Sequence, residues 1–117
     1  MAVDCTCVPG EFRFELEVKT DDFPDETSWE LRNNDGEVTQ SVEEGGYDGS
    51  HQITFNYTYC LSAGNYTFTI FDSSSDGFCC EFGNGYYEGN IHGRTQIFKG
   101  NKFSGQETHS FSGEDLC

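Results

Sequence analysis

The sequence has few basic residues and no long apolar run. Six Lys and Arg stand against 21 Asp and Glu, which gives a formal net charge of −15. A surface of this charge repels the phosphates of nucleic acids and anionic lipid headgroups, so we expect no nucleic acid partner. No apolar stretch approaches the roughly 18 residues that a membrane span requires, so we expect no membrane insertion.

Two further absences bear on fold and activity. No stretch long enough for a helix has helical periodicity, and glycine and asparagine occur throughout. The chain contains neither a His-Glu-x-x-His zinc motif nor a Gly-x-Ser-x-Gly nucleophile elbow. His51, His92 and His109 lie on separate predicted turns or strands, which favours exposed polar roles. We therefore predict an all-β protein that is not an enzyme.

Aromatic residues make up 15% of the chain and alternate with polar residues in short runs. The clearest run is 11–19, where Phe12, Phe14, Leu16 and Val18 share one face, as in a half-buried strand. Similar runs predict strands at 26–33, 38–42, 53–60, 66–70, 86–91, 94–99 and 107–111. Seven or eight such strands predict an antiparallel, jelly-roll-like β-sandwich made by one domain over 1–117.

Turn residues predict how neighbouring strands pair. Asn33-Asn34-Asp35-Gly36 and His92-Gly93 predict hairpins, because these residues tolerate positive φ. Strands 53–60 and 66–70 are separated by a short turn with Gly64, and we expect them to pair in opposite directions.

Six cysteines without a paired CxxC arrangement predict disulfides formed in an oxidising compartment. They are Cys5, Cys7, Cys60, Cys79, Cys80 and Cys117. The sequence does not decide their connectivity; the most economical interpretation joins Cys60 to Cys79 or Cys80, and Cys5 or Cys7 to Cys117. Residues 1–10 are then an N-terminal segment that disulfides hold in place. Two Asn-x-Thr sequons, at Asn56 and Asn65, agree with N-glycosylation of a secreted, extracellular protein.

The turn-rich segment 70–87 contains Asp72 and Asp76 and needs a disulfide or a bound cation to hold it. A second acidic loop, with Asp21, Asp22 and Glu26, also lies at a strand end. If the loops meet, their carboxylates repel one another unless a cation lies between them, and Ca²⁺ suits such oxygen ligands. The alternative is that Asp72 and Asp76 cap backbone N–H groups in Asx turns.

Four aromatic residues beside glycines predict an exposed ligand-binding surface: Tyr47, Phe82, Tyr86 and Tyr87. Planar side chains that stand clear of the backbone can stack on sugar rings or on a partner protein. The alternative is that half of them complete an aromatic core.

The segments DDFPDETSWEL, YCLSAGNYTFTIFDSSSDGFCCEFGNGYY and GQETHSF resemble a domain that recurs in large secreted proteins of diatoms, other algae and marine bacteria. The resemblance covers about 12–111 and implies an extracellular β-sandwich module, similar to prepeptidase-type and carbohydrate-binding sandwiches. Asp72, Asp76 and Gly77 match the acidic turn of that family, and its first motif is matched by Pro24, Glu26 and Trp29. The chain departs from the family at Ser75, where glycine is common.

Two functional hypotheses follow. The first is a non-catalytic, secreted, calcium-stabilised module that binds extracellular polysaccharide or matrix. The second is a structural subunit or repeat of a glycosylated filament or surface coat, in which copies assemble through end cysteines or strand edges. An enzyme is the least favoured reading, because no basic residue adjoins Cys79 and Cys80 to activate a thiol.

Overall fold

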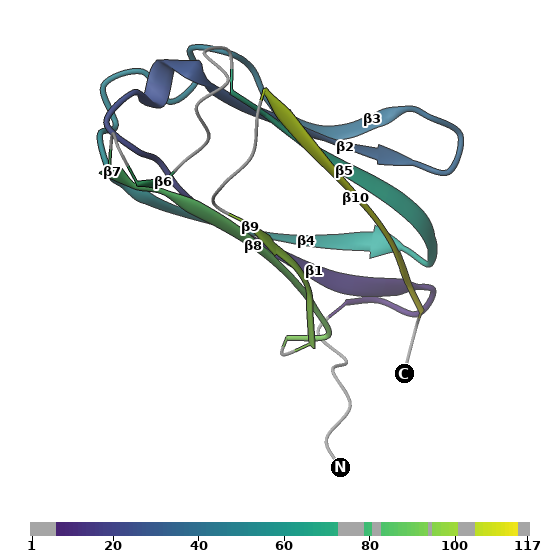
Figure 1. The fold of residues 1–117 in the computed structure, drawn as a ribbon. Coiled ribbons are helices and arrows are strands. Elements are labelled where there is room, and N and C mark those ends of the chain that lie inside the picture. The colour runs from purple at the N-terminus through teal and green to yellow at the C-terminus, as the bar shows by residue number, and fades with distance from the viewer. Residues whose placement is uncertain (1–6, 73–78, 81–82, 94, 101–104, 115–117) are drawn as a thin grey trace.

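The computed structural model describes residues 7–72, 79–80, 83–93, 95–100 and 105–114. Two four-stranded antiparallel sheets pack face to face, which confirms the predicted β-sandwich (Figure 1). Sheet A contains, in spatial order, β4 (Thr54–Ser62), β1 (Glu11–Lys19), β8 (Tyr86–Ile91) and β9 (Thr95–Gly100). Sheet B contains β10 (Gln106–Gly113), β5 (Gly64–Asp72), β2 (Thr27–Asn33) and β3 (Val38–Val42).

Three short elements accompany the sheets. A single turn of 3₁₀ helix, η1 (Pro24–Glu26), joins β1 to β2, and β6 (Cys79–Cys80) pairs with β7 (Gly83–Asn84) between β5 and β8. Within the described ranges, no helix is long and apolar enough to cross a membrane.

The core lies between the sheets and is mostly aromatic. The alternation in β1 places Phe12, Phe14, Leu16 and Val18 inward, each at most 2% exposed. From sheet B, the side chains of Trp29, Leu31, Phe68 and Ile70 meet them and are at most 1% exposed. The pleat of each strand therefore sends one set of side chains into the core and leaves the alternate set on an outer face.

The chain crosses between the sheets more often than the turn signals predict. The hairpins at 33–36 and 92–93 are confirmed as the β2–β3 and β8–β9 pairs. The predicted pairing of 53–60 with 66–70 is wrong, because β4 pairs with β1 whereas β5 pairs with β2 and β10. Gly64 has φ of 151°, and the short connection passes from one sheet to the other instead of folding back. Such repeated crossing between two sheets is jelly-roll-like.

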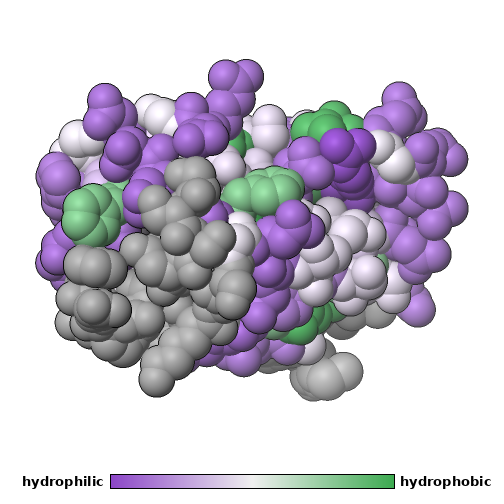
Figure 2. All heavy atoms as spheres, turned by 45° about the horizontal axis from the view of Figure 1, so that its top comes forward, coloured by the Kyte–Doolittle hydropathy of each residue, from purple (hydrophilic) through white to green (hydrophobic). Residues whose placement is uncertain are grey.

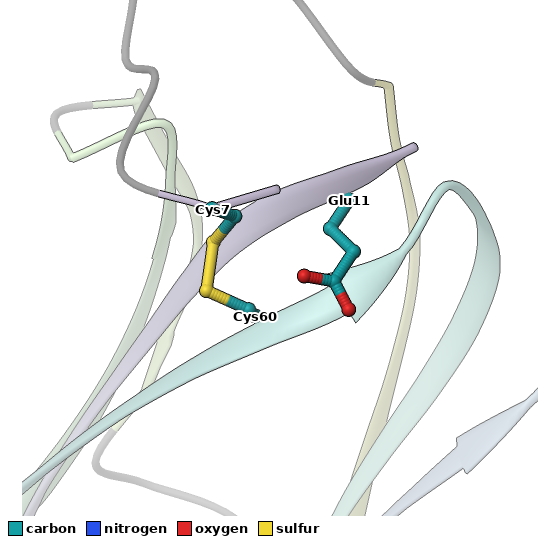
Figure 3. Close-up of side chains that lie close together, drawn as sticks. All are labelled: Cys7, Glu11 and Cys60. Carbon is teal, nitrogen blue, oxygen red and sulfur yellow. A yellow bond between two sulfur atoms is a disulfide. The ribbon is translucent and has the colours of Figure 1, made fainter. Parts of the chain in front are cut away.

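A disulfide joins Cys7 to Cys60, with the two Cα atoms 5.6 Å apart (Figure 3). The predicted bond from Cys60 to Cys79 or Cys80 is therefore wrong, and so is the option that joins Cys7 to Cys117. The reason is that β4 pairs with β1, so that Cys60 lies opposite Arg13. The segment before β1 folds back toward β4, where the N–H of Ala63 donates to the carbonyl of Gly10 (2.9 Å), and this brings Cys7 to Cys60. Cys5, Cys117 and the side chains of Cys79 and Cys80 lie outside the described part of the chain.

Candidate functional site

The two predicted acidic loops lie at the same end of the sandwich. Asp72 ends β5 and pairs with Thr27, which directly follows Glu26. Asp21 follows β1, and its Oδ1 accepts a hydrogen bond from the N–H of Phe23 (2.8 Å), which is an Asx turn. Both Asp21 and Asp72 are 3% exposed, so this end of the molecule contains two buried carboxyl groups.

The described carboxyl groups do not by themselves form a cation site. Among the described residues, no three of Asp21, Asp22, Glu26 and Asp72 bring their oxygens within 4.8 Å of one another. Asp22 is exposed and accepts a hydrogen bond from Nε2 of Gln52 (2.8 Å). The fifth predicted ligand, Asp76, lies outside the described residues.

One group of potential metal ligands does lie close together, namely Cys7, Glu11 and Cys60 (Figure 3). The two sulfur atoms are bonded to each other as a disulfide. A metal ion is bound by cysteine as the thiolate, so this group is a cross-link beside a carboxylate and not a metal site.

The prediction of an exposed aromatic surface is wrong for Tyr47 and Tyr87, for which the alternative of an aromatic core holds. Tyr47 is 2% exposed and Tyr87 is 0% exposed, so both complete the core. The glycine-rich loop folds back so that the hydroxyl of Tyr47 accepts a hydrogen bond from Nε1 of Trp29 (2.8 Å) and meets the hydroxyl of Tyr57 (2.6 Å). Tyr86 is half-buried on the outer face of sheet A, and its hydroxyl donates to Glu17. Phe82 lies outside the described residues.

These environments raise two tyrosine pKa values. Burial raises the pKa of Tyr47 well above its ordinary value, and the hydrogen bond to Tyr57 adds to the effect. The hydrogen bond to the Glu17 carboxylate raises the pKa of Tyr86 to about 12, with burial as a smaller cause. Both hydroxyls stay protonated at neutral pH.

A polar cluster links β8 of sheet A to β10 of sheet B. The hydroxyl of Tyr87, from β8, donates to Glu107 of β10 and lies 2.7 Å from Nε2 of His109. The imidazole of His109 stacks on Phe98, with ring centroids 4.9 Å apart. Because Tyr87 is fully buried, this cluster acts as a cross-link between the sheets.

The outer faces of the two sheets differ sharply in charge. The outer face of sheet A carries seven charged side chains: Glu11, Arg13, Glu15, Glu17, Lys19, Glu88 and Lys99. On the outer face of sheet B, whose four strands are all described, the only charged side chains are Glu30 and Arg32. These two pair with each other at 2.8 Å, so this face has no net charge.

A groove of about 620 Å³ crosses the outer face of sheet B. Its floor is a row of side chains from three neighbouring strands, in which Arg32 lies beside Thr67 and Thr67 beside Ser110. Asn65 and Ser112 form the next row. The β2–β3 turn, with Asn33, Asn34 and Gly36, makes the wall. The groove is therefore lined by amides, hydroxyls and one guanidinium group, together with the aromatic residues Tyr66 and Phe111.

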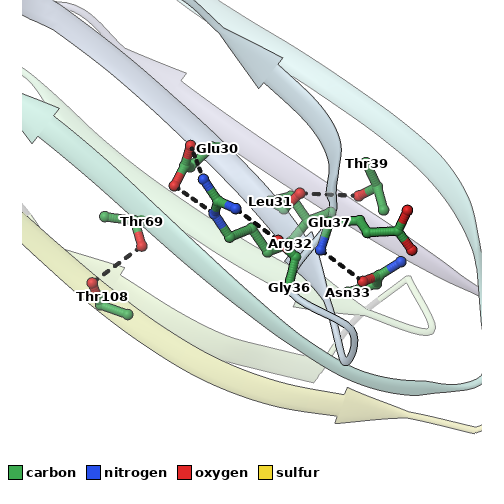
Figure 4. A network of polar contacts seen from close by, with 9 residues as sticks. All are labelled: Glu30, Leu31, Arg32, Asn33, Gly36, Glu37, Thr39, Thr69 and Thr108. Carbon is green, nitrogen blue, oxygen red and sulfur yellow. Dashed lines mark hydrogen bonds and ion pairs between the residues drawn. The ribbon is translucent and has the colours of Figure 1, made fainter.

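Hydrogen bonds fix the wall of this groove in place (Figure 4). Arg32 binds both carboxylate oxygens of Glu30, at 2.8 and 3.2 Å, and donates from Nη1 to the carbonyl of Gly36 (2.7 Å). The bond to Glu30 also raises the pKa of Arg32, so the guanidinium stays charged. Oδ1 of Asn33 accepts from the N–H groups of Asp35 and Glu37, both at 3.0 Å. The groove is thus pre-formed, with its donors already oriented.

The groove and its surroundings were missed at the sequence level. A second hollow of about 400 Å³ adjoins it and shares Asn33, Asn34, Asn65 and Tyr66. Farther along β5, Phe71 is half-buried on the same outer face. A signal was present for Phe71, because it has opposite parity to the inward residues Phe68 and Ile70. The hydrophilic surface in Figure 2 is interrupted by small, separate apolar patches.

Both predicted glycosylation residues have exposed side chains. Asn56 lies on the outer face of β4, and Asn65 lines the groove just described. A glycan on Asn65 would project from the row of Asn65 and Ser112, whereas Thr67 and Ser110 form the next row of the groove. N-glycosylation stays a prediction.

Comparisons with known proteins assign no function to this site. No protein-family model matches the sequence, and a search of curated proteins finds no match either. The resemblance to secreted algal and marine bacterial domains therefore stays a prediction.

Proposed function

We propose that the protein is a non-catalytic, secreted module that binds a neutral extracellular polysaccharide on the outer face of sheet B. The observation that carries this proposal is the uncharged groove. A chain with a net charge of −15 keeps one whole sheet face free of net charge and fills it with amides and hydroxyls. Solubility alone would not require such a face.

The groove matches the chemistry of sugar hydroxyls. Each hydroxyl both donates and accepts, and an asparagine amide offers the same pair of functions in a fixed plane. Asn34 on the wall and Thr67 and Ser110 on the floor present such groups to one groove. Phe71 lies four residues from Thr67 along β5, about 13 Å away, and offers a ring face to a more distant sugar.

Calcium stabilisation is a second part of the proposal. Asp21 and Asp72 are buried at one end of the sandwich, where the loop after β1 meets the end of β5. Carboxylate oxygens are the ligands that Ca²⁺ prefers, and a cation bound by these two loops would join them. The cation would stabilise the fold and would not contact the groove.

Affinity electrophoresis through gels containing neutral or anionic polysaccharides tests the binding proposal. The native protein should be retarded by at least one neutral polysaccharide, and the double variant Asn34→Ala/Ser110→Ala should lose most of the retardation. Glu15→Ala, on the outer face of sheet A, is the matched control and should bind like the native protein. Retardation that is equal in all three proteins, or none in any neutral gel, contradicts the proposal.

A further inference from the structure

Strand β4 is an edge strand without the features that normally prevent edge-to-edge association. Among the described residues, no strand pairs with its outer edge. Natural edge strands are usually protected by charged side chains, proline or a bulge. The nine residues of β4 include neither a charge nor a proline, and the register with β1 is unbroken from Thr54 to Ser62.

At most positions of β4, residues at equal distances on either side of Thr58 are of a similar type. Tyr57 mirrors Tyr59, Phe55 mirrors Leu61, and Thr54 mirrors Ser62. In a twofold symmetric interface each residue must suit its mirror position on the other copy. If two β4 strands pair in opposite directions about Thr58, Tyr57 of each copy faces Tyr59 of the other. Asn56 then faces Cys60, which is bonded to Cys7, and this pair is alike only in carrying no charge.

The half-buried aromatic residues of β4 point to the same arrangement. Phe55, Tyr57 and Tyr59 face the core but stay partly exposed at the open edge of the sandwich. Tyr57 and Tyr59 are stacked with an interplanar angle of 11° and ring centroids 6.2 Å apart. A second β4 would continue this stack across the interface and complete the burial of its outer rings.

Electrostatics favours β4 over the other edges. Two copies that each carry a net charge of −15 can approach only where their surfaces are uncharged. From Gln52 to Gly64 no residue is charged. By contrast, antiparallel self-pairing of β3 about Gln40 would set Glu37 against Glu43 of the other copy. The remaining edges, β9 and β10, carry Lys99 and Glu107.

We propose that a second copy of this chain pairs with β4, so that sheet A continues across a twofold axis at Thr58 as one eight-stranded sheet. The interface is independent of the groove, which lies on the outer face of sheet B. Because the contact is uncharged while the two copies repel each other, added salt should strengthen the association.

Sedimentation velocity over a wide concentration range tests this dimer, before and after enzymatic removal of any N-glycan. In about 0.5 M NaCl, where the Debye length is only a few ångströms, the mass should rise from 13.1 kDa to twice that value in at least one of the two forms. The dimer should weaken at least tenfold at low salt. A monomer at all concentrations in both forms overturns the proposal.

Two matched variants locate the interface. Thr58→Lys sets two ammonium groups opposite each other on the axis and should abolish the dimer. Gln96→Lys places the same charge on β9, the other edge of sheet A, and should leave the dimer intact. Tryptophan fluorescence, which reports the buried Trp29, should show that both variants are folded. A dimer that survives Thr58→Lys, or that Gln96→Lys abolishes, overturns the proposal.

Discussion

Tyr47 shows how a single residue in a glycine-rich loop organises the core. Its hydroxyl is the acceptor for the only tryptophan in the chain and lies 2.6 Å from the hydroxyl of Tyr57. The loop that carries it is polar in sequence, yet this one side chain enters the sandwich beside Phe55. The residue thus connects a surface loop to both sheets.

Replacing Tyr47 by phenylalanine should destabilise the protein by about 1–3 kcal/mol, because the buried N–H of Trp29 loses its acceptor. Urea unfolding followed by the fluorescence of Trp29 measures this loss. Tyr59→Phe is the control, since among the described residues the hydroxyl of Tyr59 makes no hydrogen bond, and its ring stack with Tyr57 would remain. Equal stability of the two variants would show that the Trp29 bond contributes nothing.

Tyr86 gives the fold a dependence on alkaline pH. Its pKa rises from an ordinary value of about 10 in the unfolded chain to about 12 in the folded protein. Since the folded-state pKa is the higher one, the stabilisation is complete below pH 10 and is lost as the pH rises from 10 to 12. Carbon-13 NMR of the tyrosine Cζ atoms should show Tyr86 titrating near pH 12. In Glu17→Gln the same signal should move back toward pH 10; an unchanged titration contradicts the assigned cause.

Among the elements, the disulfide between Cys7 and Cys60 fixes the segment before β1 against β4. The two cysteines are 53 residues apart in sequence, and closing a loop of this size stabilises a fold by about 4 kcal/mol in the chain-entropy model. The double variant Cys7→Ala/Cys60→Ala should lose stability of that order in urea unfolding. The single variant Cys7→Ala should lose as much, because the effect belongs to the cross-link. A loss below about 1 kcal/mol would show that the unfolded chain is already restricted.

The loop after β1 and the end of β5 should respond together to calcium. Adding millimolar Ca²⁺ after chelation should raise the Tm, by the equivalent of about 2.7 kcal/mol when calcium exceeds its Kd a hundredfold. Asp72→Asn should lose the response, whereas Glu15→Gln, on the outer face of sheet A, should keep it. The same Tm with and without calcium rules out the cation.

Elements formed by neighbouring residues could be predicted from the sequence. The alternation of 11–19 identified β1 and its four core residues, and the turn residues identified the β2–β3 and β8–β9 hairpins. The sheet to which β5 belongs could not be predicted, because a short turn at Gly64 permits either a hairpin or a crossing. The disulfide prediction failed for the same reason.

The groove on sheet B could not be predicted, because its floor is formed by side chains that are neighbours across strands and not along the chain. Arg32, Thr67 and Ser110 are far apart in sequence and become neighbours only through the register of β2, β5 and β10. The aromatic prediction went wrong for a related reason, since glycine neighbours do not reveal whether Tyr47 turns outward or into the core.

On the scale of the whole molecule, the two sheets present different surfaces to solvent. Sheet A presents charged residues on its outer face and an uncharged, self-complementary edge at β4. Sheet B presents a neutral groove stabilised by the Glu30–Arg32 pair. These surfaces do not overlap, so a dimer through β4 would carry two grooves and bind a long polysaccharide more tightly than one copy.

Mapping a neutral oligosaccharide onto the protein by NMR tests the central claim most directly. Backbone amide shifts should change in a saturable way at Arg32, Thr67 and Ser110, and at Asn34 on the wall of the groove. Amides of β1 on sheet A should stay unchanged. Shifts confined to sheet A, or no saturable change with any neutral oligosaccharide, would contradict the assignment of the outer face of sheet B as the binding surface.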